Sequence, residues 1–80
     1  MAHVRYWAGA QEIAGALEQT VPAASLDELL AVVRNEHGDR MTRLLDVGLV
    51  LVDGERAARG VDQALAESAI VEILPPFAGG

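Results

Sequence analysis

Residues 69–80 read Ala-Ile-Val-Glu-Ile-Leu-Pro-Pro-Phe-Ala-Gly-Gly, an apolar run followed by two prolines and a short tail. Glu72 is the only polar residue of the run at 69–74, which is typical of a strand in the interior of a sheet. Proline has no N–H to donate and holds φ near about −65°. The strand is therefore predicted to end at Leu74, and the chain to leave the sheet as a stiff, extended arm.

The tail at residues 75–80 is where we expect the chemistry of this chain. Glycine has no Cβ, so a partner's backbone can close around Gly79 and Gly80, and a narrow channel can admit a terminal carboxylate. A carboxylate is a poor electrophile, and a second enzyme has to activate it, for example as an acyl-adenylate. The alternative is a frayed chain end. The two prolines and the strand that leads directly into the tail favour the functional interpretation.

The main helix has the clearest start signal in the sequence. Ser25 is followed three residues later by Glu28, the spacing of a capping box. Apolar residues then recur at helical spacing from Leu26 to Val33. Gly38 is placed to adopt the left-handed conformation past the last turn. These signals predict a helix over residues 26–37.

The remaining elements follow from short local patterns. An apolar run at residues 49–52 precedes Asp53 and Gly54, which indicates a strand and a tight hairpin turn. Further elements are expected as strands at 3–7, 16–21 and 55–57, short helices at 9–14 and 40–46, and a helical turn at 62–65. This order predicts an α+β fold, with a mixed sheet of four to five strands and the main helix on one face.

The composition excludes several classes of function. The chain has 80 residues with 12 acidic and 6 basic side chains, a net charge of −6, so binding to nucleic acid is not expected. There is no cysteine, and His3 and His37 are far apart in sequence and are interpreted as solvated, so no metal site is expected. No apolar run approaches the ~20 residues of a membrane span, and we expect a cytoplasmic protein.

One face of the sheet is expected to dock a partner. Alternate residues of the last strand face opposite sides of the sheet. If the main helix covers the side of Val71, then Ile70 and Leu74 keep exposed apolar surface, and Trp7 joins them if the first and last strands are neighbours. We predict that these three residues contribute to docking, with Trp7 and Phe77 as anchors. The alternative is that loops of the chain itself cover them.

The tail, the strand that runs into it, the Val52-Asp53-Gly54-Glu55 turn and the pair Tyr6-Trp7 resemble the small subunit of molybdopterin synthase, a ubiquitin-like β-grasp sulfur carrier. The resemblance implies a β-grasp domain at residues 1–74 and an extended tail at 75–80. It implies that a ubiquitin-activating-like adenylating enzyme uses ATP to activate the terminal carboxylate of Gly80. A sulfur donor then converts Gly80 into a thiocarboxylate.

The resemblance also implies a partner and a pathway. The large synthase subunit would receive the tail, within a heterotetramer, and hold the active site where sulfur goes to cyclic pyranopterin monophosphate in molybdenum cofactor biosynthesis. The chain itself would bind no cofactor and supply no catalytic side chain. Two alternatives stay open: a sulfur carrier for thiamin or cysteine biosynthesis, and a non-catalytic ubiquitin-like protein tag. Besides Leu74, Trp7 and Ile70, the partner-binding residues are expected to be Pro75, Pro76, Phe77, Ala78 and Gly79.

Overall fold

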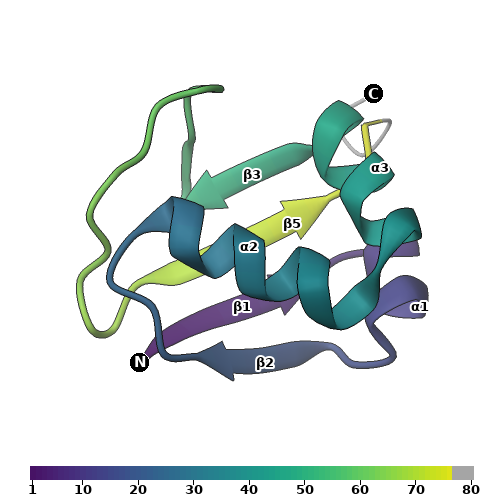
Figure 1. The fold of residues 1–80 in the computed structure, drawn as a ribbon, viewed down its shortest axis with the longest axis horizontal. Coiled ribbons are helices and arrows are strands. Elements are labelled where there is room, and N and C mark those ends of the chain that lie inside the picture. The colour runs from purple at the N-terminus through teal and green to yellow at the C-terminus, as the bar shows by residue number, and fades with distance from the viewer. Residues whose placement is uncertain (77–80) are drawn as a thin grey trace.

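The computed structural model describes residues 1–76, which form a five-stranded sheet packed against helices (Figure 1). The elements in chain order are β1 (Ala2–Tyr6), α1 (Gly9–Ala14), β2 (Glu18–Val21), α2 (Leu26–His37), α3 (Asp39–Val47), β3 (Leu49–Val52), β4 (Glu55–Arg56) and β5 (Ile70–Leu74). The strand order is β2-β1-β5-β3-β4, with β1 parallel to β5 and the other pairs antiparallel. This mixed sheet with its main helix α2 confirms the predicted β-grasp fold.

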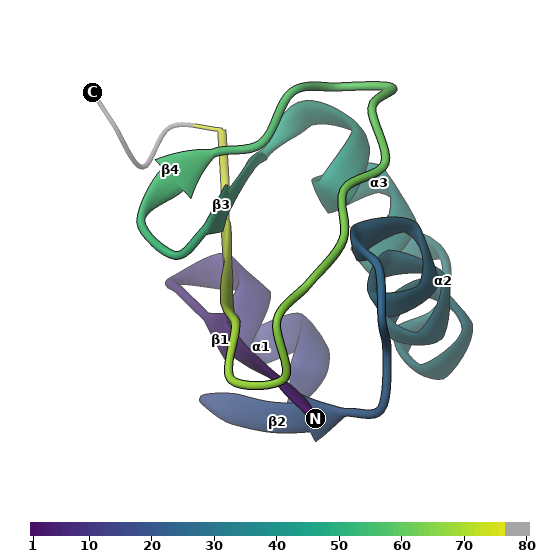
Figure 2. The same cartoon turned by 90° about the vertical axis from the view of Figure 1, so that its left-hand side faces the viewer.

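Strand β5 lies at the centre of the sheet, as its apolar sequence predicts. It pairs with β1 on one side and with β3 on the other. Val71 and Ile73 are fully buried beside Val4 and Tyr6 of β1, and Figure 2 shows α2 and α3 together on one side of the sheet. Removing such a side chain from water stabilises the fold by about 1.5–3 kcal/mol. The helices complete the core with Leu26, Leu29, Val33, Met41 and Leu45.

Helix α2 begins and ends at the residues that the sequence predicts. The Ser25 hydroxyl oxygen accepts a hydrogen bond from the backbone N–H of Glu28, at 3.3 Å. Gly38 follows the helix with a φ of 78°, which glycine adopts without strain. Its ψ of −158° differs from the predicted left-handed conformation, because Gly38 is also the N-cap of α3 and the chain must turn into that helix at once.

The hairpin after β3 also follows its prediction. Asp53 and Gly54 both have positive φ, 49° and 84°, as a two-residue hairpin loop of type I′ requires. The other predicted bounds differ from the structure by one or two residues. β1 starts at Ala2, β2 starts at Glu18, and α3 extends by one residue at each end beyond the predicted 40–46.

The segment between β4 and β5 contradicts one prediction. No helical turn forms at residues 62–65, which run instead beside the start of α2. The Leu26 N–H donates to the Gln63 carbonyl and the Leu65 N–H donates to the Ala24 carbonyl, both at 2.9 Å. The backbone groups of this segment therefore pair with residues about 40 positions away in the chain, and such distant pairing leaves no local pattern.

Candidate functional site

The face of the sheet opposite α2 and α3 carries the residues that are predicted to dock a partner (Figure 2). Trp7 and Ile70 each keep 40% of their surface exposed, and Leu74 is half-buried. Loops within residues 1–76 therefore leave them accessible. We call the surface formed by Trp7, Ile70, Glu72 and Leu74 the open face. The binding role of these residues stays a prediction.

The pairing of β1 with β5 brings the members of the open face together. The parallel register places Arg5 beside Glu72, and the backbone N–H of Trp7 donates to the backbone carbonyl of Ile73 at 3.0 Å. The indole of Trp7 consequently emerges next to the middle of β5. The condition that the sequence left open, that the first and last strands are neighbours, is met.

Two charged side chains hold the indole of Trp7. Its Nε1–H donates to the Glu72 carboxylate at 2.9 Å, and the guanidinium carbon of Arg5 lies 5.4 Å from the ring centroid. An ordered side chain loses less conformational entropy on binding, so these contacts would favour the anchor role that stays a prediction for Trp7. Sequence reasoning missed the roles of Arg5 and Glu72. The one available signal was Glu72, the single polar residue of an otherwise apolar strand.

Strand β3 extends the apolar part of the open face. The antiparallel register pairs Leu49 with Leu74 and Leu51 with Glu72, so both leucines share this side of the sheet. Each is half-buried. The apolar run at residues 49–52 predicted a strand, but it could not show that the strand is a neighbour of β5. The surface available to a partner therefore spans three strands.

The chain passes from the open face directly into its tail. β5 ends at Leu74, as predicted. Pro75 is buried, and its Cγ lies 3.8 Å from the position that a Cβ on Gly9 would occupy, so this proline packs against the start of α1. Pro76 is exposed. The body of the protein thus holds the tail through Pro75. The remaining predicted site residues, Phe77, Ala78, Gly79 and Gly80, lie outside the described residues.

Tyr6, Gln19 and His37 form a polar cluster between the sheet and the end of α2. The prediction that His37 is solvated is therefore wrong. The Tyr6 hydroxyl donates to Gln19 Oε1 at 2.6 Å, and His37 Nε2 lies 3.4 Å from that hydroxyl. His37 is half-buried because the end of α2 packs over β1 and β2. Burial, with a smaller contribution from Glu36, raises the pKa of Tyr6 to about 12. The Tyr6 hydroxyl therefore stays protonated at neutral pH and can donate the hydrogen bond to Gln19.

Within residues 1–76, no cluster of three or more histidine, aspartate or glutamate side chains could hold a metal ion. Over the same residues, no helix has the length and apolar character that crossing a bilayer requires.

Comparison with known proteins gives one family and several similar structures. The profile described as the ThiS family matches residues 4–80. The comparison with curated proteins finds no match. The fold is similar to SAMP1 from Haloferax volcanii, with a TM-score of 0.77 and 25% identity over 99% of this chain and 98% of that one. It is also similar to the small archaeal modifier protein 1 from Methanosarcina acetivorans, with a TM-score of 0.77 and 18% identity over 99% and 95% of the two chains.

A third similar structure is a complex. It is the protein–protein complex of subunits 1 and 2 of the molybdopterin-converting factor from Helicobacter pylori 26695. The TM-score is 0.74, at 19% identity over 99% of this chain and 97% of that one. At this identity the likeness supports the fold.

Proposed function

Because the chain belongs to the ThiS family of β-grasp sulfur carriers, we propose that it is the small, sulfur-carrying subunit of molybdopterin synthase, with Gly80 as its reactive residue. The observation that carries this proposal is the position of the open face, which lies largely on β5. This strand continues directly into the tail. A partner that covers Trp7 and Ile70 also lies at the point where the tail begins. One docking event then positions the whole carrier and delivers its end.

The proposed chemistry uses a carboxylate at Gly80 and groups that belong to other proteins. An adenylating partner joins the carboxylate to the α-phosphate of ATP and releases pyrophosphate. A sulfur donor then displaces AMP from the acyl carbon, which leaves a thiocarboxylate. The large synthase subunit passes this sulfur to cyclic pyranopterin monophosphate, and water restores the carboxylate. ATP is thus consumed by the adenylating partner, and the present chain contributes its shape, its open face and its tail.

Three observations support this proposal over other kinds of protein. The family profile extends to Gly80, so the match includes the tail. One similar structure is a complex between the two subunits of a molybdopterin-converting factor. The open face offers an ordered tryptophan with apolar neighbours, which is the composition of a binding hot spot.

The chemistry is tested by the mass of the intact protein isolated from its own cells. We expect a fraction in which one oxygen has been replaced by sulfur, and tandem mass spectrometry should place the sulfur at Gly80. Deletion of Gly80 should abolish this species and the synthesis of the cofactor in those cells. Cofactor synthesis that proceeds equally well without Gly80 would contradict the proposal.

The docking role is tested with a matched pair of variants. Ile70→Ala shortens a side chain of the open face that is 40% exposed, and Val32→Ala shortens one on α2 that is 38% exposed. Calorimetric titration with the large subunit should show at least about a tenfold loss of affinity for Ile70→Ala, which corresponds to about 1.4 kcal/mol. Val32→Ala should bind like the unchanged protein. Equal affinities for both variants would remove the open face from the interface.

A protein tag is the second candidate function, and the 25% identity to SAMP1 from Haloferax volcanii favours including it. The sequence has no lysine, so a tag of this kind could not build lysine-linked chains on itself. Its last arginine is Arg59, so trypsin would leave residues 60–80 attached to a target lysine. Detection of that remnant would favour the tag. A carrier for thiamin or cysteine biosynthesis would instead show the thiocarboxylate but would not bind the large synthase subunit.

A further inference from the structure

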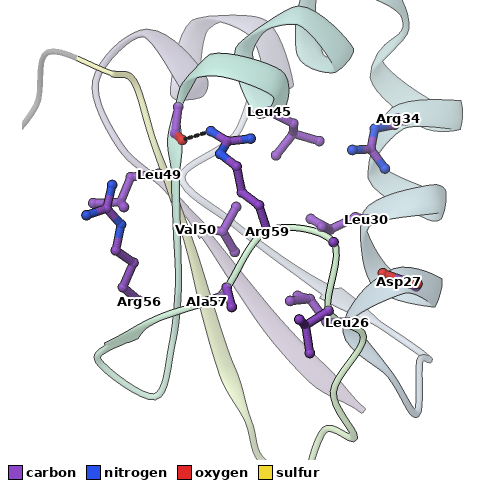
Figure 3. Close-up of a pocket in the computed structure, with 14 residues that line it drawn as sticks. Leu26, Asp27, Leu30, Arg34, Leu45, Leu49, Val50, Arg56, Ala57 and Arg59 are labelled. Carbon is purple, nitrogen blue, oxygen red and sulfur yellow. Dashed lines mark hydrogen bonds between the residues drawn. The ribbon is translucent and has the colours of Figure 1, made fainter.

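A pocket of about 690 Å³ lies between α2, the start of β3 and the segment that follows β4 (Figure 3). Leu49, on the open side of β3, borders this pocket, whereas Trp7, Ile70, Glu72 and Leu74 do not line it. Its lining is mixed, with eight aliphatic and four charged residues among 14. The aliphatic side chains that line it are Leu26, Leu30, Leu45, Leu49, Val50, Ala57, Ala58 and Val61.

Three arginines line this pocket: Arg34 and Arg59 flank Leu45 at one end, and Arg56 lies beside Leu49. In Figure 3, Arg34 of α2 and Arg59 of the segment after β4 carry their guanidinium groups to either side of Leu45. Arg59 also donates to the Gly48 carbonyl at 2.8 Å, which fixes the direction of its side chain. Within residues 1–76, no carboxylate forms a salt bridge with either arginine.

Arg34 and Arg59 are distinguished by their position at the pocket and not by the lack of a carboxylate partner. Of the six arginines, Arg5 is the one that forms a salt bridge within residues 1–76, at 4.0 Å to Glu18, so the lack of a carboxylate partner is common in this chain. Arg34 lies in the last turn of α2, where a cation stabilises the helix dipole, but that explanation does not extend to Arg59. Both side chains border the aliphatic part of the pocket. Within residues 1–76, neither forms a salt bridge with a carboxylate.

The opposite end of the pocket has a different character. Asp27 lies seven residues before Arg34 on the same helix, about 10 Å away at 1.5 Å per residue. Figure 3 shows it away from the two guanidinium groups. The pocket is therefore cationic at one end, apolar in the middle and acidic at the other end. This order of charges selects the orientation of a bound molecule.

We propose that this pocket binds a small organic anion with an apolar body, of which a medium-length carboxylate is the simplest example. The carboxylate is held by Arg34 and Arg59, whose planar guanidinium groups bond carboxylate oxygens with good geometry. The carbon chain lies on the aliphatic lining and ends short of Asp27. The volume agrees, since sites for small molecules occupy about 300–1,000 Å³. The proposal is independent of sulfur transfer.

The test is a titration of the ¹⁵N-labelled protein with hexanoate, followed by two-dimensional NMR. We expect saturable shifts of the amides of Leu45, Gly48 and the residues at 57–61, with no change at the amides of Trp7 and Ile70. Hexan-1-ol has the same carbon chain without the charge and should bind at least about tenfold more weakly, the effect of losing about 1.4 kcal/mol. Shifts of equal size with both compounds would overturn the proposal.

Substitutions of the two arginines test whether the carboxylate of hexanoate binds between them. Arg34→Gln and Arg59→Gln should each weaken hexanoate binding at least fivefold, while Arg40→Gln, at an exposed position of α3 outside the pocket, should leave it unchanged. The thermal unfolding of each variant shows that it is folded. Equal affinities for all three variants would refute the arginine site. If the peptide acetyl-Glu-Leu-Asp-amide shifts the same amides at lower concentration than hexanoate, the pocket is a protein-docking groove and the proposal is wrong.

Discussion

Gly48 joins α3 to β3 at a point where the structure leaves no room for a side chain. A Cβ built on this residue would stand 2.6 Å from the carbonyl oxygen of Leu44 and even closer to that of Leu74. Both obstacles are backbone atoms, which cannot swing aside as the end of a flexible side chain can. The φ of Gly48 is −86°, which any residue adopts, so the predicted penalty of Gly48→Ala is purely steric.

The size of this penalty follows from two opposing effects. Overpacking in a well-packed region costs about 1–3 kcal/mol, and two clashes with backbone place this site at the upper end. Alanine also restricts the unfolded chain, which returns about 0.4–1 kcal/mol. The net loss for Gly48→Ala is then about 2 kcal/mol. For a domain of this size that lowers the midpoint of thermal unfolding by about 8–16 °C.

The test of this prediction compares the unfolding free energies of Gly48→Ala and Gly9→Ala, measured in urea. A Cβ on Gly9 would lie 3.8 Å from Pro75 Cγ, an ordinary contact, so Gly9→Ala should be neutral or slightly stabilising. The reasoning fails if Gly48→Ala stays within about 0.5 kcal/mol of the unchanged protein, a difference typical of harmless surface substitutions. It also fails if Gly9→Ala is destabilised to the same extent.

Three further predictions concern the packing that supports the sheet. Unfolding free energy should fall as the pH rises from about 10 to about 12, because the pKa of Tyr6 is raised to about 12 in the folded chain and unfolding then releases its proton. The chain has one tyrosine and no lysine, so Tyr6→Phe should remove this slope in urea midpoints measured against pH, and a slope that persists would contradict the assignment. Ser25→Ala removes the cap of α2 and should cost about 1 kcal/mol in urea unfolding, with no loss counting against the capping role. Asp62→Ala removes a carboxylate that accepts the Asp27 N–H at 2.9 Å, and it should cost about 0.5–1 kcal/mol in the same assay; an unchanged midpoint would show that water replaces this contact.

The strongest predictions from the sequence were local ones. The spacing of Ser25 and Glu28 located the start of α2, and Asp53 with Gly54 located the hairpin turn. The end of β5 at Leu74 followed from the prolines that come after it. In each case the cause lies within a few residues, in a side chain that caps a backbone group, a φ that the residue tolerates, or an N–H that is missing. Such effects are readable before the fold is known.

The open face shows the boundary between the two kinds of information. Alternation along β5 was enough to place Ile70 and Leu74 on one side of the sheet. The exposure of that side and the nearness of Trp7 depended on which strands pair. The bond from the indole to Glu72 joins residues 65 positions apart, and no spacing rule connects them.

The two wrong predictions and the pocket have the same physical cause, which is contact between segments far apart in the sequence. The helical turn expected at residues 62–65 is absent because those backbone groups bond to the start of α2, and His37 is half-buried because α2 packs over Tyr6. Arg34 and Arg59 line the same pocket only because the segment after β4 lies against α2. The sequence by itself determined most of the elements, the ends of α2, the end of β5 and the composition of the tail, because those depend on neighbours along the chain. The tertiary structure alone decided which distant side chains share a surface, because that depends on strand register and on the path of the loops between them.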